Sequence, residues 1–149
     1  MKRTQLGLAV LILLVGGSAA SCQSIGDSVS DSHIDANVPD KKDFDNFLKR
    51  DLIAYFKDLR KRDVTVEYEL LRDGPTQSGI AFPKFYAWVT VKENGAPLED
   101  GAVRLAAMEK KRFGVTDYLS RAELERDLEK AYQTFPTPVA DKIKEKIKK

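Results

Sequence analysis

The chain of 149 residues contains a single cysteine, Cys22, and a single histidine, His33. Catalysis of the Ser-His or Cys-His type needs a nucleophile, a base and a group that orients the base. Both residues precede the first amphipathic segment, so neither chemistry is available to a domain that follows them. One cysteine forms no intramolecular disulfide, and core packing alone must hold the domain. We expect a protein that is not an enzyme.

The sequence also lacks an excess of one charge. It has 25 basic and 23 acidic side chains, and the chain after residue 21 has 23 of each, because Lys2 and Arg3 precede that point. A nucleic-acid-binding protein needs a basic excess or stripe, so we expect no nucleic-acid partner. The acidic pairs Glu67/Glu69 and Glu99/Asp100 show no recognised ligand spacing, and we expect no metal or other cofactor. Acid-base chemistry at Glu67 or Glu69 is the remaining enzymatic alternative.

The N-terminal apolar run, from Leu6 to Val15, is too short to span a bilayer, which takes roughly 20 residues. Lys2 and Arg3 precede this run, and small residues follow it. A basic start, a short apolar stretch and small residues are the three parts of a secretory signal. We therefore predict a signal peptide at residues 1–21.

The sequence Ala19-Ala20-Ser21-Cys22 resembles the lipobox of bacterial lipoprotein precursors, although Ala19 stands where that family usually has leucine. The resemblance implies that Cys22 becomes the N-terminus and carries a diacylglycerol, often with a third chain such as palmitate. It also implies the outer membrane, facing the periplasm, because Gln23 and not aspartate follows the cysteine. Ordinary signal-peptidase cleavage after Ala20 is the alternative.

Residues 22–40 are expected to form the lipidated cysteine and a flexible tether. The stretch is rich in Ser, Asp, Gly and Asn and has no sustained apolar period. Eighteen flexible residues span about 23 Å root-mean-square. His33 lies in this stretch, and we expect its ring to be solvated.

Residues 41–149 are expected to form one α+β domain. Apolar residues at helical spacing predict a helix over 41–63. Alternating residues predict strands at 64–71 and 85–95 and favour a further strand over 102–119, bent or broken at Gly114. Ser120 and Glu123 match a capping box that opens a helix ending before Pro136, and Pro138 fits the first turn of a last helix.

This order predicts a long N-terminal helix packed on a twisted antiparallel sheet of three to four strands, followed by one or two C-terminal helices. By element order alone it is similar to the cystatin-like and nuclear-transport-factor-like rolls. Such an analogy implies no chemistry.

Alternation divides the predicted sheet into two faces. Phe85, Ala87, Val89 and Val91 are expected to face the long helix, and Tyr86 and Trp88 the opposite side. Two interpretations of this second face stay open: the C-terminal helices cover it, or it binds a partner or an apolar ligand. The candidate binding residues on it are Glu67, Glu69, Tyr86, Trp88, Arg104 and Met108.

Two further segments are ambiguous. The loop at 74–79, GPTQSG, is either a plain connection or a backbone nest for an anion. The lysines of the last ten residues are either solvated or in contact with anionic headgroups. The leading hypothesis is a membrane-anchored lipoprotein whose domain binds another cell-envelope protein. The alternative is a small-molecule or lipid-binding module with a cavity between the long helix and the sheet.

Overall fold

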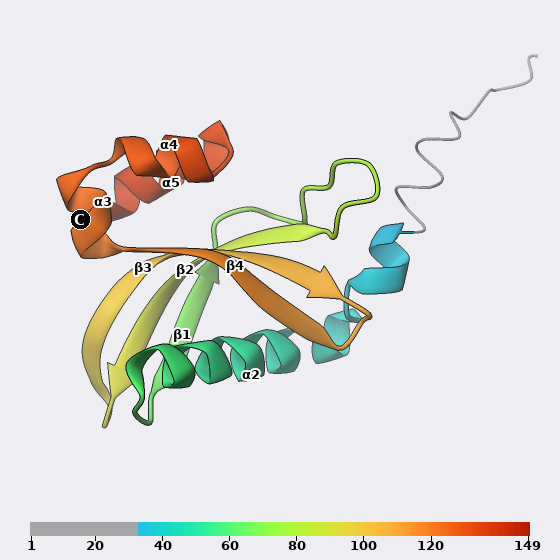
Figure 1. Cartoon of the computed structure of the whole chain (residues 1–149), viewed down its shortest axis with the longest axis horizontal. Helices are drawn as coiled ribbons and strands as arrows, with labels where there is room; N and C mark the ends of the chain where they lie inside the picture. Colours follow the sequence, from blue (N-terminus) through green and yellow to red (C-terminus); the bar gives the residue numbers. More distant parts are fainter. Residues whose placement is uncertain (1–32) are drawn as a thin grey trace, which may run out of the picture.

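The computed structural model describes residues 33–149, so the predictions on the signal peptide, Cys22 and the first part of the tether lie outside the described residues. A four-stranded antiparallel sheet lies between one long helix and three short ones, which cover its opposite faces (Figure 1). The predicted α+β fold is confirmed. Its elements are α2 (Lys41–Arg60), β1 (Thr65–Leu70), β2 (Lys84–Glu93), β3 (Ala96–Met108), β4 (Arg112–Ser120), α3 (Arg121–Arg126), α4 (Glu129–Thr134) and α5 (Thr137–Ile147).

Helix α2 forms where the apolar period predicts it. Leu48, Leu52 and Phe56 recur at i, i+4 and i+8, and all three are fully buried against the sheet. Asp40 is the N-cap residue, but its side chain makes no capping hydrogen bond. Within residues 33–149, no helix has both the length and the apolar character that a bilayer crossing requires.

The strands pair in chain order, β1-β2-β3-β4, each antiparallel to its neighbour. The predicted alternation is correct, because the odd-numbered residues of β2 from Phe85 to Val91 pack against α2 and Tyr86 and Trp88 pack on the other face. Five consecutive residues, from Phe85 to Val89, are buried. Strand β2 is therefore covered on both sides.

The stretch predicted as one long strand at 102–119 is a hairpin of two. The break falls at residues 109–111 and not at Gly114. Glu109 and Lys110 have φ of 54° and 57°, the left-handed conformation that a tight hairpin turn needs. Gly114 lies within β4, where a glycine weakens a strand without ending it.

Strand β3 also begins earlier than expected, at Ala96 and not after residue 101. Two carboxylates near its start are held by distant arginines. Arg60 at the end of α2 pairs with Glu99, and Arg121 pairs with Asp100 at 2.7 Å. These ion pairs fix a polar segment in the sheet, where its own composition favours a loop.

The C-terminal region begins with the predicted capping box at Ser120, but the helix that it opens is interrupted. The single helix predicted before Pro136 is two short helices, α3 and α4, with Asp127 and Leu128 between them. Pro138 lies in the first turn of α5, as predicted.

Residues 33–40 belong to the folded domain, although we expected them to be part of the tether. Residues 33–37 form a helical turn, and Asn37 is buried. The backbone oxygen of Asn37 accepts a hydrogen bond from Lys110 N at 2.9 Å, and its side-chain Oδ1 accepts one from Glu109 N at 3.3 Å. His33 is half-buried and stacks on Phe82 with 6.0 Å between ring centroids, so the expectation of a solvated ring is wrong.

Gly101 makes the closest approach between β3 and β4. A Cβ atom there would collide with the backbone of Leu119 and Ser120, just before α3 begins. We expect Gly101→Ala to lower the free energy of unfolding by about 1–3 kcal/mol or more, because backbone gives way only at high cost. Urea unfolding followed by circular dichroism measures the loss.

Gly114→Ala is the matched control in the neighbouring strand. Its new Cβ would meet only the flexible end of Met108, at 2.7 Å, and the side chain can move away. Equal losses for the two substitutions would contradict the close approach at Gly101.

Candidate functional site

The second face of the sheet is covered by α3, α4 and α5. Tyr86 is 4% exposed and Trp88 6% exposed. They lie in a second core cluster with Leu71, Ala102, Leu124, Ala131, Phe135, Val139, Ala140 and Ile143. Of the two interpretations left open by the sequence, the structure therefore favours a covered face over an open one.

Three of the six candidate binding residues either bond to other parts of the domain or lie at the far end of β3. Tyr86 shares a short hydrogen bond of 2.5 Å with the hydroxyl of Thr76, which closes the loop after β1. Arg104 pairs with Asp117 and donates a hydrogen bond to Thr134 O at 2.9 Å, which fixes the end of α4. Met108 is the last residue of β3, beside the hairpin turn.

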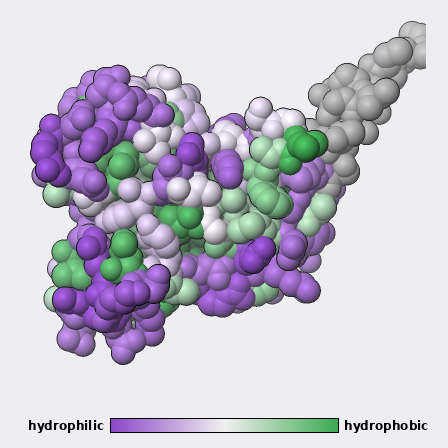
Figure 2. Space-filling model, in the orientation of Figure 1, coloured by the Kyte–Doolittle hydropathy of each residue, from purple (hydrophilic) through white to green (hydrophobic). Residues whose placement is uncertain are grey.

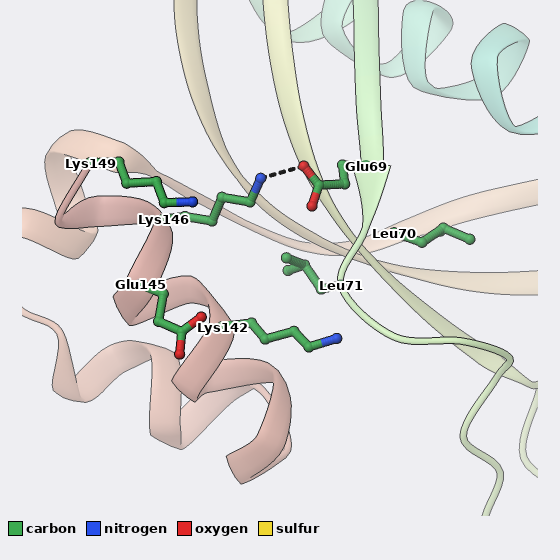
Figure 3. A pocket seen from close by; sticks show the side chains of 7 residues that line it. All are labelled: Glu69, Leu70, Leu71, Lys142, Glu145, Lys146 and Lys149. Carbon is green, nitrogen blue, oxygen red and sulfur yellow. Dashed lines mark hydrogen bonds and ion pairs between the residues drawn. The ribbon is translucent and has the colours of Figure 1, made fainter.

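The other three candidates, Glu67, Glu69 and Trp88, meet at a groove between β1 and α5, hereafter the β1–α5 groove. One part of it, about 340 Å³, is lined by Glu67, Tyr68, Glu69, Trp88, Thr90, Arg121, Lys146 and Lys149. The adjoining part, about 240 Å³, shares Glu69, Lys146 and Lys149 and adds Leu70, Leu71, Lys142 and Glu145 (Figure 3). The C-terminal helices thus leave β1 uncovered on this face of the sheet.

Lysines from one side of α5 form one wall of the groove. Lys142, Lys146 and Lys149 are spaced i, i+4 and i+7, which brings them to the same side of a helix. Figure 3 shows Lys142 and Lys146 extending from α5, and Lys149, two residues after the helix ends at Ile147, beside Lys146. The sequence carried this signal in the spacing of the terminal lysines, but we considered them only as solvated or membrane-facing.

The charges of the groove are partly neutralised. Lys146 pairs with Glu69, and Lys92 pairs with Glu67 at 2.5 Å. Lys142 and Lys149 form no ion pair with any residue between 33 and 149. Glu145, which also lines the groove, forms no ion pair among these residues either, so the unpaired charged side chains of the groove are two lysines and one glutamate, a net charge of one positive.

The floor of the groove is an aromatic ring capped by a cation. The guanidinium of Arg121 lies 5.2 Å from the centre of the Trp88 ring. Asp100 holds that guanidinium through hydrogen bonds of 2.7 to 3.0 Å and raises the pKa of Arg121 above its ordinary value. The side chain of Tyr68 lies on the α2 side of the sheet, where burial and a hydrogen bond to Asp45 raise its pKa, so its hydroxyl stays protonated and donates to that carboxylate. Neither group is suited to exchange protons near neutral pH.

The groove borders an open sheet edge, because β1 pairs only with β2. Leu71 N donates a hydrogen bond to Tyr86 O at 2.8 Å. Residues that form backbone hydrogen bonds to the neighbouring strand alternate along an antiparallel strand. The backbone N–H and C=O groups of Glu67 and Glu69 therefore also point towards β2. The N–H and C=O groups of Val66, Tyr68 and Leu70 point outward, and these are the groups through which an edge strand pairs with another chain.

The remaining sequence candidates do not join this site. The loop at 74–79 has positive φ at Gly74 and Gly79, as an anion nest would need. However, Thr76 and Lys84 exchange backbone hydrogen bonds of 2.8 and 2.9 Å across it, which is the arrangement of a plain strand connection. Among residues 33–149, no three His, Cys, Asp or Glu side chains are grouped closely enough to hold a metal ion.

No protein-family model, curated protein or solved structure matches this chain.

The capping box at Ser120 sets the direction in which Arg121 enters the groove. Ser120 Oγ accepts from Glu123 N at 3.3 Å, and Glu123 Oε2 accepts from Ser120 N at 3.0 Å. Ser120 Oγ also donates to Glu123 Oε2 at 2.8 Å, and this bond first, then the one from Ser120 N, holds the pKa of Glu123 below its ordinary value of 4.5. The carboxylate therefore stabilises the fold above pH 4.5 and loses this effect as the pH falls through the lowered pKa. We expect Ser120→Ala to lower the free energy of unfolding by about 1 kcal/mol at pH 7.

That loss should shrink as the pH falls from 4.5 through the lowered pKa of Glu123, at which the carboxyl becomes protonated in the wild type. Urea unfolding at several pH values measures it. Glu125→Ala is the control, because this carboxylate on the same helix is 3.9 Å from Arg121 and makes no capping bond. A loss for Ser120→Ala that does not change with pH would show that the Glu123 carboxylate does not contribute through the cap.

Proposed function

We propose that the protein is a bacterial lipoprotein, anchored through acylated Cys22 to the outer membrane and facing the periplasm, whose domain binds another envelope protein without catalysing a reaction. The observation that carries the binding role is the open edge of β1 next to a row of lysines on α5. The lipobox-like sequence before Cys22 supports the anchor.

The partner segment would bind as an added strand. The outward N–H and C=O groups of Val66, Tyr68 and Leu70 supply hydrogen bonds to any extended peptide, and neighbouring side-chain positions supply the selectivity. Alternate side chains of such a segment point to the same side of the sheet as Glu67 and Glu69, which is the side on which α5 lies.

The charges of the groove favour an acidic segment. Lys142 and Lys149 have no ionic partner among the described residues, whereas Lys92 and Lys146 neutralise the two glutamates. An extended segment with acidic residues at alternate positions would place its carboxylates beside these free ammonium groups. Each such contact is modest in water, so backbone pairing would provide the affinity and the lysines the choice of partner.

The alternative, a small-molecule or lipid-binding module, has less support. It requires a cavity between α2 and the sheet, and that interface is filled by Leu48, Leu52 and Phe56 against Phe85, Val89 and Leu105, each at most 3% exposed. The groove itself is open and lined mainly by charged side chains. An apolar ligand would find little apolar surface there.

The anchor is tested by the intact mass of the protein extracted from membranes of its host. We expect a species that begins at Cys22 and is heavier by a diacylglycerol, with or without a third acyl chain. An unmodified species that begins at Ser21 would mean ordinary cleavage after Ala20 and would overturn the lipoprotein assignment.

The binding role is tested by site-specific photocrosslinking in intact host cells. A photoreactive p-benzoylphenylalanine replaces Glu67 on the open edge, and in a matched variant it replaces Thr116, an exposed residue on the opposite edge strand β4. We expect a defined protein adduct from position 67 and none of that mass from position 116. Adducts that are identical at both positions, or absent from position 67, would contradict the proposal.

The acidic character of the partner is tested by charge reversal on α5. Lys142→Glu combined with Lys149→Glu should reduce the position-67 adduct several-fold, because both free ammonium groups are replaced by carboxylates. Lys144→Glu combined with Lys148→Glu changes the net charge equally but affects lysines that do not line the groove. An equal reduction in the two double variants would mean that only net charge matters.

A further inference from the structure

The most exposed large apolar side chain of the described domain lies in the loop between β1 and β2. Ile80 is 84% exposed, and Phe82 in the same loop is 43% exposed. The loop is not loose at its base, because Pro83 is fully buried and its carbonyl accepts a hydrogen bond from Ala107 N at 2.9 Å. The apolar tip is thus held out from the domain by a fixed base (Figure 1).

The start of the described chain lies against this loop. The ring of His33 stacks on Phe82, and Asn37 binds the backbone of the β3–β4 turn. Three segments therefore form one end of the domain, hereafter the loop end: residues 33–40, 72–83 and 109–112. Figure 2 shows hydrophobic surface gathered on the side of the molecule where these segments lie, and hydrophilic surface over the C-terminal helices.

The loop end also carries unpaired basic side chains. Lys110, Lys111 and Arg112 are exposed in succession in the β3–β4 turn, next to Glu109, and the other two segments of the loop end carry Arg72, Asp35, Asp40 and Asp73. Their side chains form no ion pair within residues 33–149. Apolar side chains next to clustered lysine and arginine are the composition with which peripheral proteins contact an anionic bilayer.

The length of the preceding chain points to the same end. Ten residues separate Cys22 from His33. Even fully extended, this stretch reaches at most about 40 Å. The opposite end, at the Asn94-Gly95 turn, is further away by the length of β2, whose ten residues span roughly 33 Å. The loop end, where this stretch joins the domain, is therefore on average the end nearer to Cys22.

We propose that the loop end is a membrane-contact surface, in which Ile80 and Phe82 enter the interface of an anionic bilayer while Lys110, Lys111 and Arg112 contact its headgroups. This rests on the acyl anchor proposed above, which keeps the loop end near the lipid at high local concentration. Each contact is too weak to recruit the protein alone, but in an anchored protein it is sufficient to set the orientation of the domain.

The test uses the full-length acylated protein, reconstituted into phosphatidylcholine vesicles with and without phosphatidylglycerol. An environment-sensitive fluorophore is attached at Ile80→Cys and, as the matched control, at Asn94→Cys in the exposed turn of the opposite end. The labelling is specific, because Cys22 is the only natural cysteine and its thiol is consumed by acylation. Quenching by spin-labelled lipid reports contact with the bilayer.

We expect several-fold stronger quenching at position 80 than at position 94. Lys110→Glu combined with Lys111→Glu should reduce the quenching at position 80 in vesicles that contain phosphatidylglycerol more than in those without it. Equal quenching at positions 80 and 94 in a protein of acylated mass would overturn this inference and leave the anchor intact. A protein that carries no acyl chain and does not float with the vesicles would overturn both.

Discussion

The two apolar faces of β2 determine the architecture of the domain. Residues Phe85 to Val89 are buried without interruption, so both sides of the strand must be covered. Burying one aromatic side chain contributes about 1.5–3 kcal/mol, and removing either cover would expose several at once. Helix α2 packs on one face, and α3, α4 and α5 pack on the other. The connections between strands can then be short, and the sheet follows chain order.

The β1–α5 groove exists because the second cover ends before the sheet does. On that face β2 offers Trp88, whereas the paired position on β1 is Glu69, which cannot be buried alone. Leu71, two residues after Glu69 and just beyond the end of β1, is apolar and lies under α5. The change from Glu69 to Leu71 at the end of β1 therefore marks the border of the second core cluster.

Glutamates on an edge strand have a competing explanation, since charge discourages edge-to-edge aggregation. The ion pairs in this groove argue against that as their whole role. Lys92 and Lys146 neutralise both glutamates and so weaken their repulsion of another strand. Lys142 and Lys149 then outnumber the one unpaired glutamate of the groove, Glu145, on the same side. This arrangement repels a basic strand and admits an acidic one, which is selectivity and not simple protection.

Local patterns predicted three features that depend on near neighbours in sequence. The period of α2, the alternation of β1 and β2, and the capping box at Ser120 all match the structure. The features that were wrong or missed depend on distant residues. Asp100 is held in β3 by Arg121, and the His33 segment is held against the domain by the β3–β4 turn.

The position of the break between β3 and β4 was also predicted wrongly. Gly114 is the only glycine between residues 102 and 119, and it suggested a break that the chain makes instead at two non-glycine residues with positive φ. Part of the groove could be predicted from the sequence, because the alternation correctly placed Glu67, Glu69 and Trp88 on one face of the sheet. The lysines of α5 could be assigned to it only once the helix was known to cross that face.

The proposed membrane contact and the proposed binding groove are compatible because the loop end contains no residue of β1. The strand ends at Leu70, and the loop that follows it leads to Ile80 at the loop end. With the loop end at the bilayer, β1 runs towards the membrane from Thr65 to Leu70, and its open edge faces sideways. A partner segment that leaves the same membrane could then extend along β1 without displacing the contact. Orientation by the loop end would restrict the domain to presenting that edge, and this reduces the entropy lost on binding.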